Sequence, residues 1–314
     1  MKRIMVTGAS GQVGSDLVLE LRNRYGDDNV LATDIREPEG DQPGPFELVD
    51  CTDRDAVDRA VGDFKADTIF HLAAILSAVG EADPHMAYTV NLGGLESALE
   101  VARVRGSAIF IPSSIAAFGP STPPDPTPQV TIQRPTTIYG VTKVAGELLA
   151  DYYHLRFGVD ARGVRYPGLV SWTTEPGGGT TDYAVEIFYE ALKQGSYTCF
   201  LAADTRLDMM YMPDAIKASI DVMDADASRL KNRNAFNIAA MQITPEDLAA
   251  AIRKHIPGFT MDYDVDPTRQ AIAESWPRRL DDTAAREEWG WDPDYDLDTM
   301  VEDMLVNLRK KLEV

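Results

Sequence analysis

Short apolar runs alternate with amphipathic segments through the first half of the chain. Strands are predicted by the apolar runs at residues 3–7, 30–34, 46–50, 68–72 and 108–112. Helices are predicted between them, at residues 11–25, 53–64 and 84–104; Val13, Leu17 and Leu21 give the first one an apolar stripe. This alternation predicts an α/β fold, with a doubly wound parallel sheet covered by helices on both faces. In such a sheet the ligand binds at the carboxyl ends of the strands.

The second half of the chain is less regular. Six prolines at residues 120–135 exclude a helix or a central strand, because proline lacks a backbone N–H, so we expect a loop beside the binding crevice. A long helix is predicted at 139–157 and a strand at 159–166. From about residue 171 only short elements are predicted, such as 235–239. We therefore expect a sheet domain at 1–170 and a smaller, discontinuous C-terminal substrate lobe at 171–314, parts of which return to the first domain.

Composition and charge exclude several classes of protein. Hydrophobic residues make up 44% of the 314 residues, which is typical of a protein with a folded core. The net charge of -20 opposes contact with phosphate backbones, so we expect no nucleic-acid partner, and it fits an ordinary acidic enzyme as well as a salt-adapted one. Because no apolar run is long enough for a bilayer and no signal-like segment opens the chain, we expect no membrane partner and a cytoplasmic location.

Cysteines and histidines predict neither a disulfide framework nor a metal site. Cys51 and Cys199 lie far apart in a long chain, which favours a reducing compartment. The 4 histidines have no spacing typical of metal ligands, so no metal is expected.

A glycine-rich turn separates the first predicted strand from the first helix. It has the pattern GxxGxxG, at Gly8, Gly11 and Gly14. Glycines let backbone N–H groups approach a pyrophosphate, and the helix N-terminus adds a partial positive charge. Asp34 ends the next strand at the spacing expected for a carboxylate that holds a ribose hydroxyl. A carboxylate there repels a 2′-phosphate, so NAD is favoured over NADP, although Arg36 nearby leaves NADP as an alternative.

Tyr139 and Lys143 lie four residues apart on one predicted helix face. A free tyrosine is a poor base at neutral pH, but a nearby ammonium favours the phenolate and lowers the pKa. Tyr139 can then take a proton from a substrate hydroxyl while a hydride leaves for the cofactor. Ser113 and Ser114 end the fifth predicted strand, and either can hydrogen-bond that hydroxyl.

These motifs, with the HLAA run at residues 71–74 and Asn91, resemble the extended short-chain dehydrogenase/reductase superfamily over about the first 170 residues. The resemblance implies a Rossmann domain that binds NAD, a catalytic set of Ser114, Tyr139 and Lys143, and commonly a homodimer. Motifs and resemblance together give these expected cofactor-binding residues: Gly8, Ser10, Gly11, Gln12, Val13, Gly14, Asp34, Asp50, Cys51, Leu72, Ala73, Ala74, Asn91, Tyr139, Lys143, Tyr166 and Pro167. For Asp50, contact with the adenine edge and a simple turn at the strand end both stay open.

The second half of the chain narrows the resemblance. The segments RYPG at 165–168, PGGGTTDYAVEIF at 176–188, MMYMPD at 209–214 and SWP at 275–277 resemble the short-chain type of L-threonine 3-dehydrogenase. That family oxidises the 3-hydroxyl of L-threonine to 2-amino-3-ketobutyrate with NAD. The expected substrate residues are Ser77, Ser114, Tyr139, Thr180, Thr181 and Trp276.

Several of these assignments keep an alternative. We expect one of Thr180 and Thr181 to cap the following helix and the other to bind substrate. Trp276 fits core packing as well as a pocket wall, and Glu81 fits a solvated carboxylate better than an ammonium partner. The glycines at 177–179 predict a mobile lid.

Two other functions remain open. A nucleotide-sugar epimerase or dehydratase of the same superfamily needs a basic clamp for a second diphosphate, for which the acidic lobe offers few candidates: Arg206, Arg278 and Arg279. A non-catalytic NAD-binding sensor has no need of the Ser–Tyr–Lys set that this chain carries.

Overall fold

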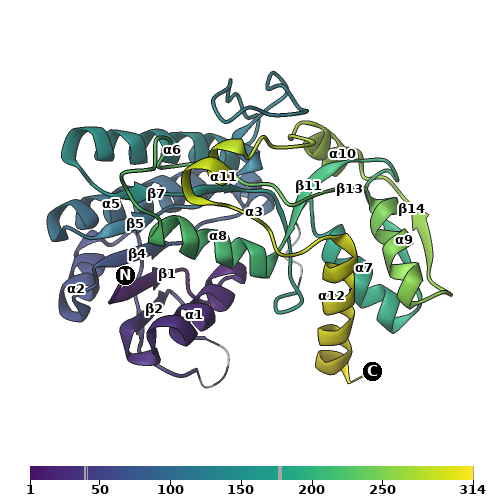
Figure 1. The fold of residues 1–314 in the computed structure, drawn as a ribbon, viewed down its shortest axis with the longest axis horizontal. Coiled ribbons are helices and arrows are strands. Elements are labelled where there is room, and N and C mark those ends of the chain that lie inside the picture. Colours follow the sequence, from purple (N-terminus) through teal and green to yellow (C-terminus); the bar gives the residue numbers. More distant parts are fainter. Residues whose placement is uncertain (39, 41, 176–178, 314) are drawn as a thin grey trace.

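The computed structural model describes residues 1–38, 40, 42–175 and 179–313. Two groups of elements lie side by side in Figure 1, one around a parallel sheet that contains the N-terminus and one that contains the C-terminus. No helix within the described ranges is long and apolar enough to cross a bilayer.

The central sheet is entirely parallel. Its strands, in spatial order, are β3 (Phe46–Leu48), β2 (Val30–Asp34), β1 (Ile4–Thr7), β4 (Thr68–His71), β5 (Ala108–Phe110) and β7 (Ala161–Arg162). The chain runs outward from β1 to β3 and then returns to the other side of β1 at β4. The β1–β4 boundary is therefore the topological switch point, where a doubly wound sheet binds its ligand.

Three short strands form a separate sheet: β6 (Ser113–Ser114), β8 (Val164–Tyr166) and β12 (Phe236–Asn237). All are parallel, and Ser113 pairs with Arg165 and Ser114 with Tyr166. β12 comes from far along the chain, so a segment of the second half pairs with a strand of the first half.

Alternating strand residues face two different helix layers, as the two-residue period of a strand requires. Met5, Ile69 and Ile109 pack under α2 (Arg54–Phe64), α5 (Gly94–Arg105) and α6 (Ile138–Phe157). Ile4, Phe70 and Phe110 pack under α1 (Gln12–Tyr25), α8 (Met212–Asp224) and α11 (Thr283–Trp289). The smaller helical elements of this part are η1 (Asp27–Asn29), α3 (Ser77–Ala82), α4 (Pro84–Tyr88), the π-helical turn η2 (Thr89–Gly93) and η3 (Ile115–Ala117).

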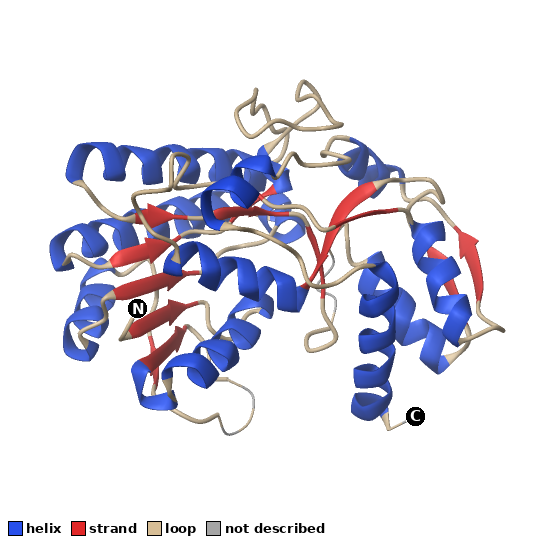
Figure 2. Ribbon diagram, in the orientation of Figure 1, coloured by secondary structure: helices blue, strands red, loops and turns tan. Residues whose placement is uncertain are grey.

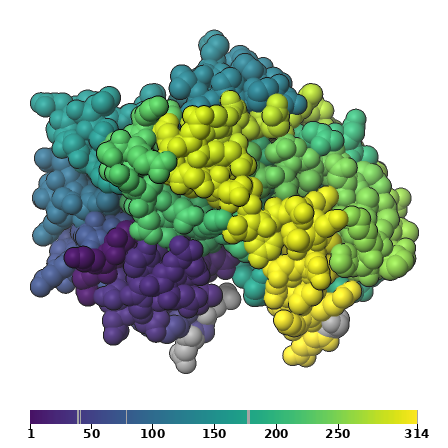
Figure 3. Space-filling model, viewed as in Figure 1, coloured from purple at the N-terminus to yellow at the C-terminus, as the bar shows by residue number. Residues whose placement is uncertain are grey.

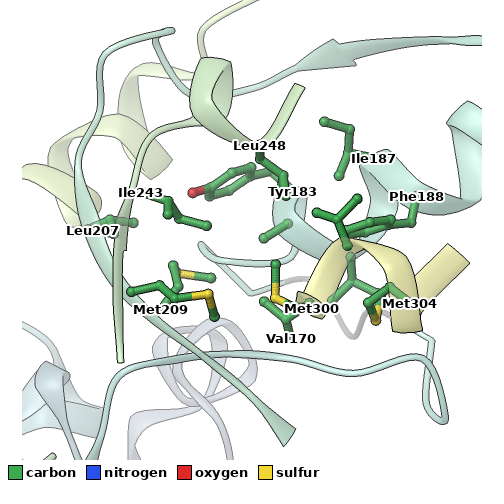
Figure 4. Packing of buried hydrophobic residues seen from close by; sticks show 14 of the residues in the cluster. Val170, Tyr183, Ile187, Phe188, Leu207, Met209, Ile243, Leu248, Met300 and Met304 are labelled. Atoms are coloured by element: carbon green, nitrogen blue, oxygen red, sulfur yellow. The ribbon is translucent and has the colours of Figure 1, made fainter. Parts of the chain in front are cut away.

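The second group of elements surrounds its own apolar cluster. Its strands are β9 (Gly168–Val170), β11 (Leu207–Tyr211) and β13 (Met241–Ile243) in one sheet, and β10 (Ser196–Cys199) and β14 (Thr260–Tyr263) in another. Its helices are α7 (Tyr183–Lys193), α9 (Pro245–His255), α10 (Pro267–Glu274) and α12 (Leu297–Leu312). Figure 4 shows side chains from α7, α9, α12 and the β9–β11–β13 sheet meeting in this cluster.

The predicted fold class is confirmed, and most predicted elements of the first half are present. The proline-rich stretch at 120–135 is a loop, as predicted. Three details differ. The predicted helix 84–104 is interrupted by the π-helical turn η2, the strand 159–166 is split into β7 and β8, and helix α3 was not predicted at all.

Strand direction places the binding region at the junction of the two groups. In Figure 2 the arrows of the central sheet point toward the C-terminal group, so their carboxyl ends open there. Figure 3 shows a notch at the lower edge of the same view, between the purple N-terminal elements and the yellow helix α12. The C-terminal group therefore faces the edge of the sheet at which a ligand is expected.

Candidate active site

The glycine-rich turn lies at the β1–β4 switch point, and its backbone leaves no room for side chains. Gly8 has φ +68°, and a Cβ there would lie 2.6 Å from the backbone nitrogen of Ala73, which follows β4. A Cβ on Gly14 would lie 2.1 Å from the Gly8 carbonyl oxygen. The turn is thus held against the end of β4 with only backbone facing outward at these two positions. That is the cradle a pyrophosphate needs before a helix N-terminus.

Asp34 lies beside this turn, at the end of β2. Its carboxylate accepts hydrogen bonds from the backbone N–H of Ser10 at 3.0 Å and of Arg36 at 3.2 Å. A carboxylate fixed beside the cradle fits the ribose hydroxyls of NAD. Asp50, by contrast, is exposed and binds the backbone N–H and hydroxyl of Thr52, as a turn residue does.

The neighbouring predicted cofactor residues have different surroundings. Ser10, Gln12 and Val13 are partly exposed around the turn, whereas Cys51 is buried against Gly94 and burial raises the pKa of its thiol to about 11. Asn91 donates both amide hydrogens, to the Ile75 carbonyl and the Thr142 hydroxyl, and accepts from the Ile75 N–H. Its side chain therefore holds the chain after β4 against α6.

His71 ends β4 and is almost fully buried. Its Nδ1 lies 3.0 Å from the Thr7 hydroxyl, and its Nε2 finds no hydrogen-bond partner among the described residues. Burial and the nearby Lys143 ammonium lower the pKa of His71 to about 4, so the ring is neutral at pH 7. Leu72, Ala73 and Ala74 follow, partly exposed at the carboxyl edge of the sheet.

The N-terminus of α6 is fixed by two capping contacts. The Thr137 hydroxyl accepts from the Gly140 N–H at 3.1 Å, and the Glu81 carboxylate accepts from the Ile138 N–H at 2.7 Å. Glu81 is exposed, which agrees with the solvated alternative, and its carboxylate in addition ties α3 to the helix that carries Tyr139 and Lys143. This contact orients the first turn of α6 toward the ends of β5 and β6.

Tyr139, Lys143 and Ser114 lie together at that edge. Lys143 Nζ donates to the Pro112 carbonyl at 2.8 Å and lies 5.3 Å from the centre of the Tyr139 ring. Burial raises the pKa of Tyr139 to about 12, while the neighbouring Ser114 hydroxyl lowers it. Burial also lowers the pKa of Lys143 to about 8. In the ligand-free protein, desolvation therefore outweighs the acidifying effect on Tyr139 that was expected from Lys143.

The two serines of β6 have different surroundings. Ser113 is buried and donates its hydroxyl hydrogen to the Glu147 carboxylate, while Ser114 accepts from the Ala116 N–H at 3.2 Å beside Tyr139. Of the two hydroxyls, Ser114 is therefore the one that faces the tyrosine. Glu147 was not predicted, although its position four residues after Lys143 on the same helix face was a visible signal.

Other predicted residues are placed as follows. Tyr166 is buried, its hydroxyl hydrogen-bonded to Ser219 of α8, and Pro167 is buried beside it. Ser77 opens α3 and is partly exposed. Trp276 is 8% exposed within the C-terminal apolar cluster, which agrees with the packing alternative.

The threonine capping prediction is wrong. The N-cap residue of α7 is Asp182, because the helix begins one residue later than expected. The Asp182 carboxylate accepts from the Gly179 N–H at 2.6 Å. Thr180 is buried, and Thr181 packs near Gly168 at the start of β9. The lid predicted at 177–179 lies outside the described residues except for Gly179.

A small cavity of about 30 Å³ lies beside Lys143 at the carboxyl end of the sheet. Its lining includes His71, Asn91, Ser113, Lys143 and Glu147. Among the residues that the structure describes, no group of three or more His, Cys, Asp or Glu side chains could hold a metal ion.

The model of the NAD dependent epimerase/dehydratase family matches residues 4–239. The chain belongs to this family. It is an enzyme of the extended short-chain dehydrogenase/reductase type, with a Rossmann sheet, and its cofactor is NAD, as predicted. The residues fit that cofactor, since the backbone cradle at Gly8 and Gly14 lies beside the Asp34 carboxylate.

Similarity to individual proteins extends over the whole chain. An uncharacterized epimerase/dehydratase of Staphylococcus haemolyticus is 57% identical, over 99% of this chain and 99% of its own. The X-ray structure of L-threonine dehydrogenase from Clostridium difficile is 53% identical with a TM-score of 0.98, covering 99% of this chain and 98% of its own. A monomeric L-threonine 3-dehydrogenase from a metagenome is 45% identical with a TM-score of 0.94, covering 98% of this chain and 99% of its own.

Proposed function

We propose that this protein oxidises the 3-hydroxyl of L-threonine to 2-amino-3-ketobutyrate, with NAD as the hydride acceptor. The observation that carries the proposal is the grouping of Ser114, Tyr139 and Lys143 at the end of β6, in a chain 53% identical over nearly its full length to an L-threonine dehydrogenase. We take residues 1–170 as the NAD-binding domain and most of 171–314 as the substrate-binding lobe.

In this proposal Tyr139 is the general base. Its phenol takes the proton of the threonine hydroxyl, and Ser114 holds that hydroxyl by a hydrogen bond. Bound NAD supplies the acceptor for the hydride that leaves C3 of threonine. The ammonium of Lys143, 5.3 Å from the centre of the Tyr139 ring, stabilises the phenolate as it forms. Burial raises the pKa of Tyr139, and the hydrogen bond with Ser114 offsets part of that rise.

The substrate is a small zwitterion, so its pocket needs donors for the carboxylate and acceptors for the ammonium. Ser77, Thr180 and Thr181 supply hydroxyls that serve as either without adding net charge. Trp276 contributes by packing behind this part of the lobe.

The test measures NADH absorbance with purified protein, NAD and one substrate at a time. Our proposal expects NADH formation with L-threonine and NAD, and much less with D-threonine, L-serine or NADP. Turnover of nucleotide sugars in place of threonine would favour an epimerase or dehydratase. Tight NAD binding with no turnover of either class would favour a sensor and overturn the proposal.

We also propose that the protein forms a homodimer through the outer face of α6. Val141, Leu148 and Leu155 repeat every seven residues along this face and are 46%, 62% and 83% exposed, with Tyr152 between them 53% exposed. A seven-residue apolar repeat is the pattern by which one helix packs along another, so a second copy of α6 is the expected partner.

Light scattering on a size-exclusion column tests the dimer. The double variant L148E/L155E is expected to run as a monomer and the control Leu19→Glu, on the exposed face of α1, to keep the wild-type mass. A wild-type protein that is monomeric at micromolar concentration would overturn this proposal.

The two buried free thiols fit a reducing, cytoplasmic compartment, which stays a proposal.

A further inference from the structure

Glu147 is the meeting point of a buried hydrogen-bond network behind the catalytic group. It lies on α6, one turn after Lys143, and is 5% exposed. Its carboxylate accepts from the Ser113 hydroxyl, from Gln133 Nε2 at 2.7 Å, and from Arg165 Nε at 3.0 Å and Nη2 at 2.8 Å. One side chain therefore binds four donors from three different segments of the chain.

These three segments are the ones that carry or support the proposed site. Ser113 precedes Ser114 on β6, and Arg165 precedes Tyr166 on β8, with both pairs in register. Successive strand residues point to opposite faces, so Ser113 and Arg165 turn toward Glu147 while their neighbours turn away. By holding Ser113 and Arg165, Glu147 sets the position of both strand ends relative to α6.

Arg165 is held as firmly on its other side. Its Nη1 donates to the Gln129 carbonyl at 2.9 Å and to Asn237 Oδ1 at 3.0 Å, and its guanidinium lies 5.0 Å from the centre of the Phe118 ring. With 6% of its surface exposed, Arg165 depends on Glu147 for charge neutralisation. The pair is thus a fixed neutral unit, and Glu147 lines the same small cavity as Lys143.

Lys143 is the cation of the proposed catalytic group, and its neighbours include one carboxylate and two neutral rings. Tyr139 and Glu147 face it from α6, neutral His71 faces it from β4, and Arg165 reaches it only through Glu147. Burial lowers the pKa of Lys143, and the negative charge of Glu147 raises it again. Glu147 is the nearby carboxylate that opposes desolvation of the ammonium.

We propose that Glu147 is a positioning residue for the reaction: it fixes the strand end that carries Ser114 and places a carboxylate one helical turn from the Lys143 ammonium, without touching substrate or cofactor. This inference rests on the proposed function for its kinetic consequences. Its electrostatic part concerns the cofactor-free protein alone and is measured there.

Two single substitutions separate this role from a merely structural one. Glu147→Gln removes the negative charge and leaves Arg165 positive, so Lys143 should lose its proton more easily. Arg165→Met removes the positive charge and leaves Glu147 negative, so Lys143 should hold its proton more strongly. Both changes break the same ion pair, so a structural role would affect both variants alike, whereas positioning by charge predicts opposite shifts.

The experiment is a ¹³C NMR titration of the lysine ε-carbons in the NAD-free protein, with the Lys143 signal assigned by its loss in Lys143→Met. We expect the Lys143 midpoint to fall by about one pH unit in Glu147→Gln and to rise in Arg165→Met. If either single variant fails to fold, the double variant E147Q/R165M takes its place, and its midpoint should lie below that of wild type, because the carboxylate that raises the Lys143 pKa is lost with its partner. The control Asp160→Asn removes a different carboxylate, one that pairs with Arg162 and Arg233, and should leave the midpoint unchanged.

Kinetics supply the second readout. In Glu147→Gln, kcat with L-threonine should fall about tenfold while KM changes less than about twofold, because the residue does not touch the substrate. Shifts of Lys143 in the same direction in both variants, or no shift in either, would overturn the inference. A wild-type protein that does not oxidise L-threonine would instead overturn the proposed function, and the titration would still decide the charge effect.

Discussion

Around Lys143 the buried side chains are polar, whereas around Met300 they are almost all apolar. The first region buries His71, Ser113, Glu147 and Arg165. The second, shown in Figure 4, is built from aliphatic, methionine and aromatic side chains, and the hydroxyl of Tyr183 within it has no hydrogen-bond partner among the described residues. Buried charges are costly but directional, while apolar packing stabilises without fixing an orientation. The comparison teaches that the polar region sets geometry and the apolar region sets stability.

The largest effect is expected for Tyr139→Phe, which changes the polar region alone. Loss of the phenol should lower kcat by about a hundredfold to ten-thousandfold, because the general base is gone, while the ring still packs. NAD affinity and the melting temperature should stay near wild type. Tyr152→Phe is the matched control, since Tyr152 lies on the same helix and is 53% exposed. A Tyr139→Phe protein that keeps a tenth of the wild-type kcat would remove the tyrosine from its proposed role.

The opposite pattern is expected for Phe188→Ala in the apolar cluster. Phe188 is fully buried on α7, so its truncation should lower the free energy of unfolding by about 3–5 kcal/mol. The molecules that remain folded should keep their kcat. Urea unfolding followed by circular dichroism measures the first effect, with Leu19→Ala, 56% exposed on α1, as the control. Equal losses in the two variants would show that Phe188 carries no special packing.

Gly14→Ala should affect cofactor binding more than stability. The new Cβ would lie 2.1 Å from the Gly8 carbonyl oxygen, so the turn must open and its N–H groups lose their alignment. We expect NAD affinity, measured by calorimetry, to fall about a hundredfold. Gly258→Ala is the control because its Cβ would meet nothing within 4 Å. Unchanged affinity in Gly14→Ala would contradict the assignment of the cradle.

His71 adds a pH dependence to stability that has no effect at neutral pH and grows as the pH falls. Burial lowers the pKa of His71 to about 4 from an ordinary value of 6.5. Between these two pH values the unfolded chain therefore binds a proton at His71 and the folded protein does not. Stability is therefore full above pH 6.5 and is lost as the pH falls toward 4, by about 3 kcal/mol at most. His71→Gln should flatten the urea-unfolding free energy over this range, whereas His255→Gln, at an exposed position, should not. Parallel curves for the wild type and His71→Gln would contradict a neutral buried His71.

The sheet half of the molecule was largely predictable. Periodicity identified its strands and helices because each element repeats one buried face, and the bounds of β2 agree with the predicted 30–34. The π-helical turn at Thr89–Gly93 was not predictable in this way, since the helical period continues through it. Helix α3 was missed because it has only six residues, too few to show a period.

The site was predictable where spacing along the chain carries the signal. Motif spacing identified four residues that lie at the carboxyl edge of the sheet: Gly8, Asp34, Tyr139 and Lys143. The Glu147–Arg165 pair did not, because its partners come from β8 and α6 and meet only after folding. The predicted direction of the shift in the Tyr139 pKa was also wrong, because the shift depends on how deeply the side chain is buried in the folded protein, which a motif does not show.

The most direct test of the central claim follows one hydrogen atom. L-Threonine carrying deuterium at C3 is incubated with the protein and NAD, and the reduced cofactor is examined by mass spectrometry. We expect one deuterium in each NADH formed and a ketone at C3 of the product. NADH formed without deuterium would show that a different carbon is oxidised and would contradict the account.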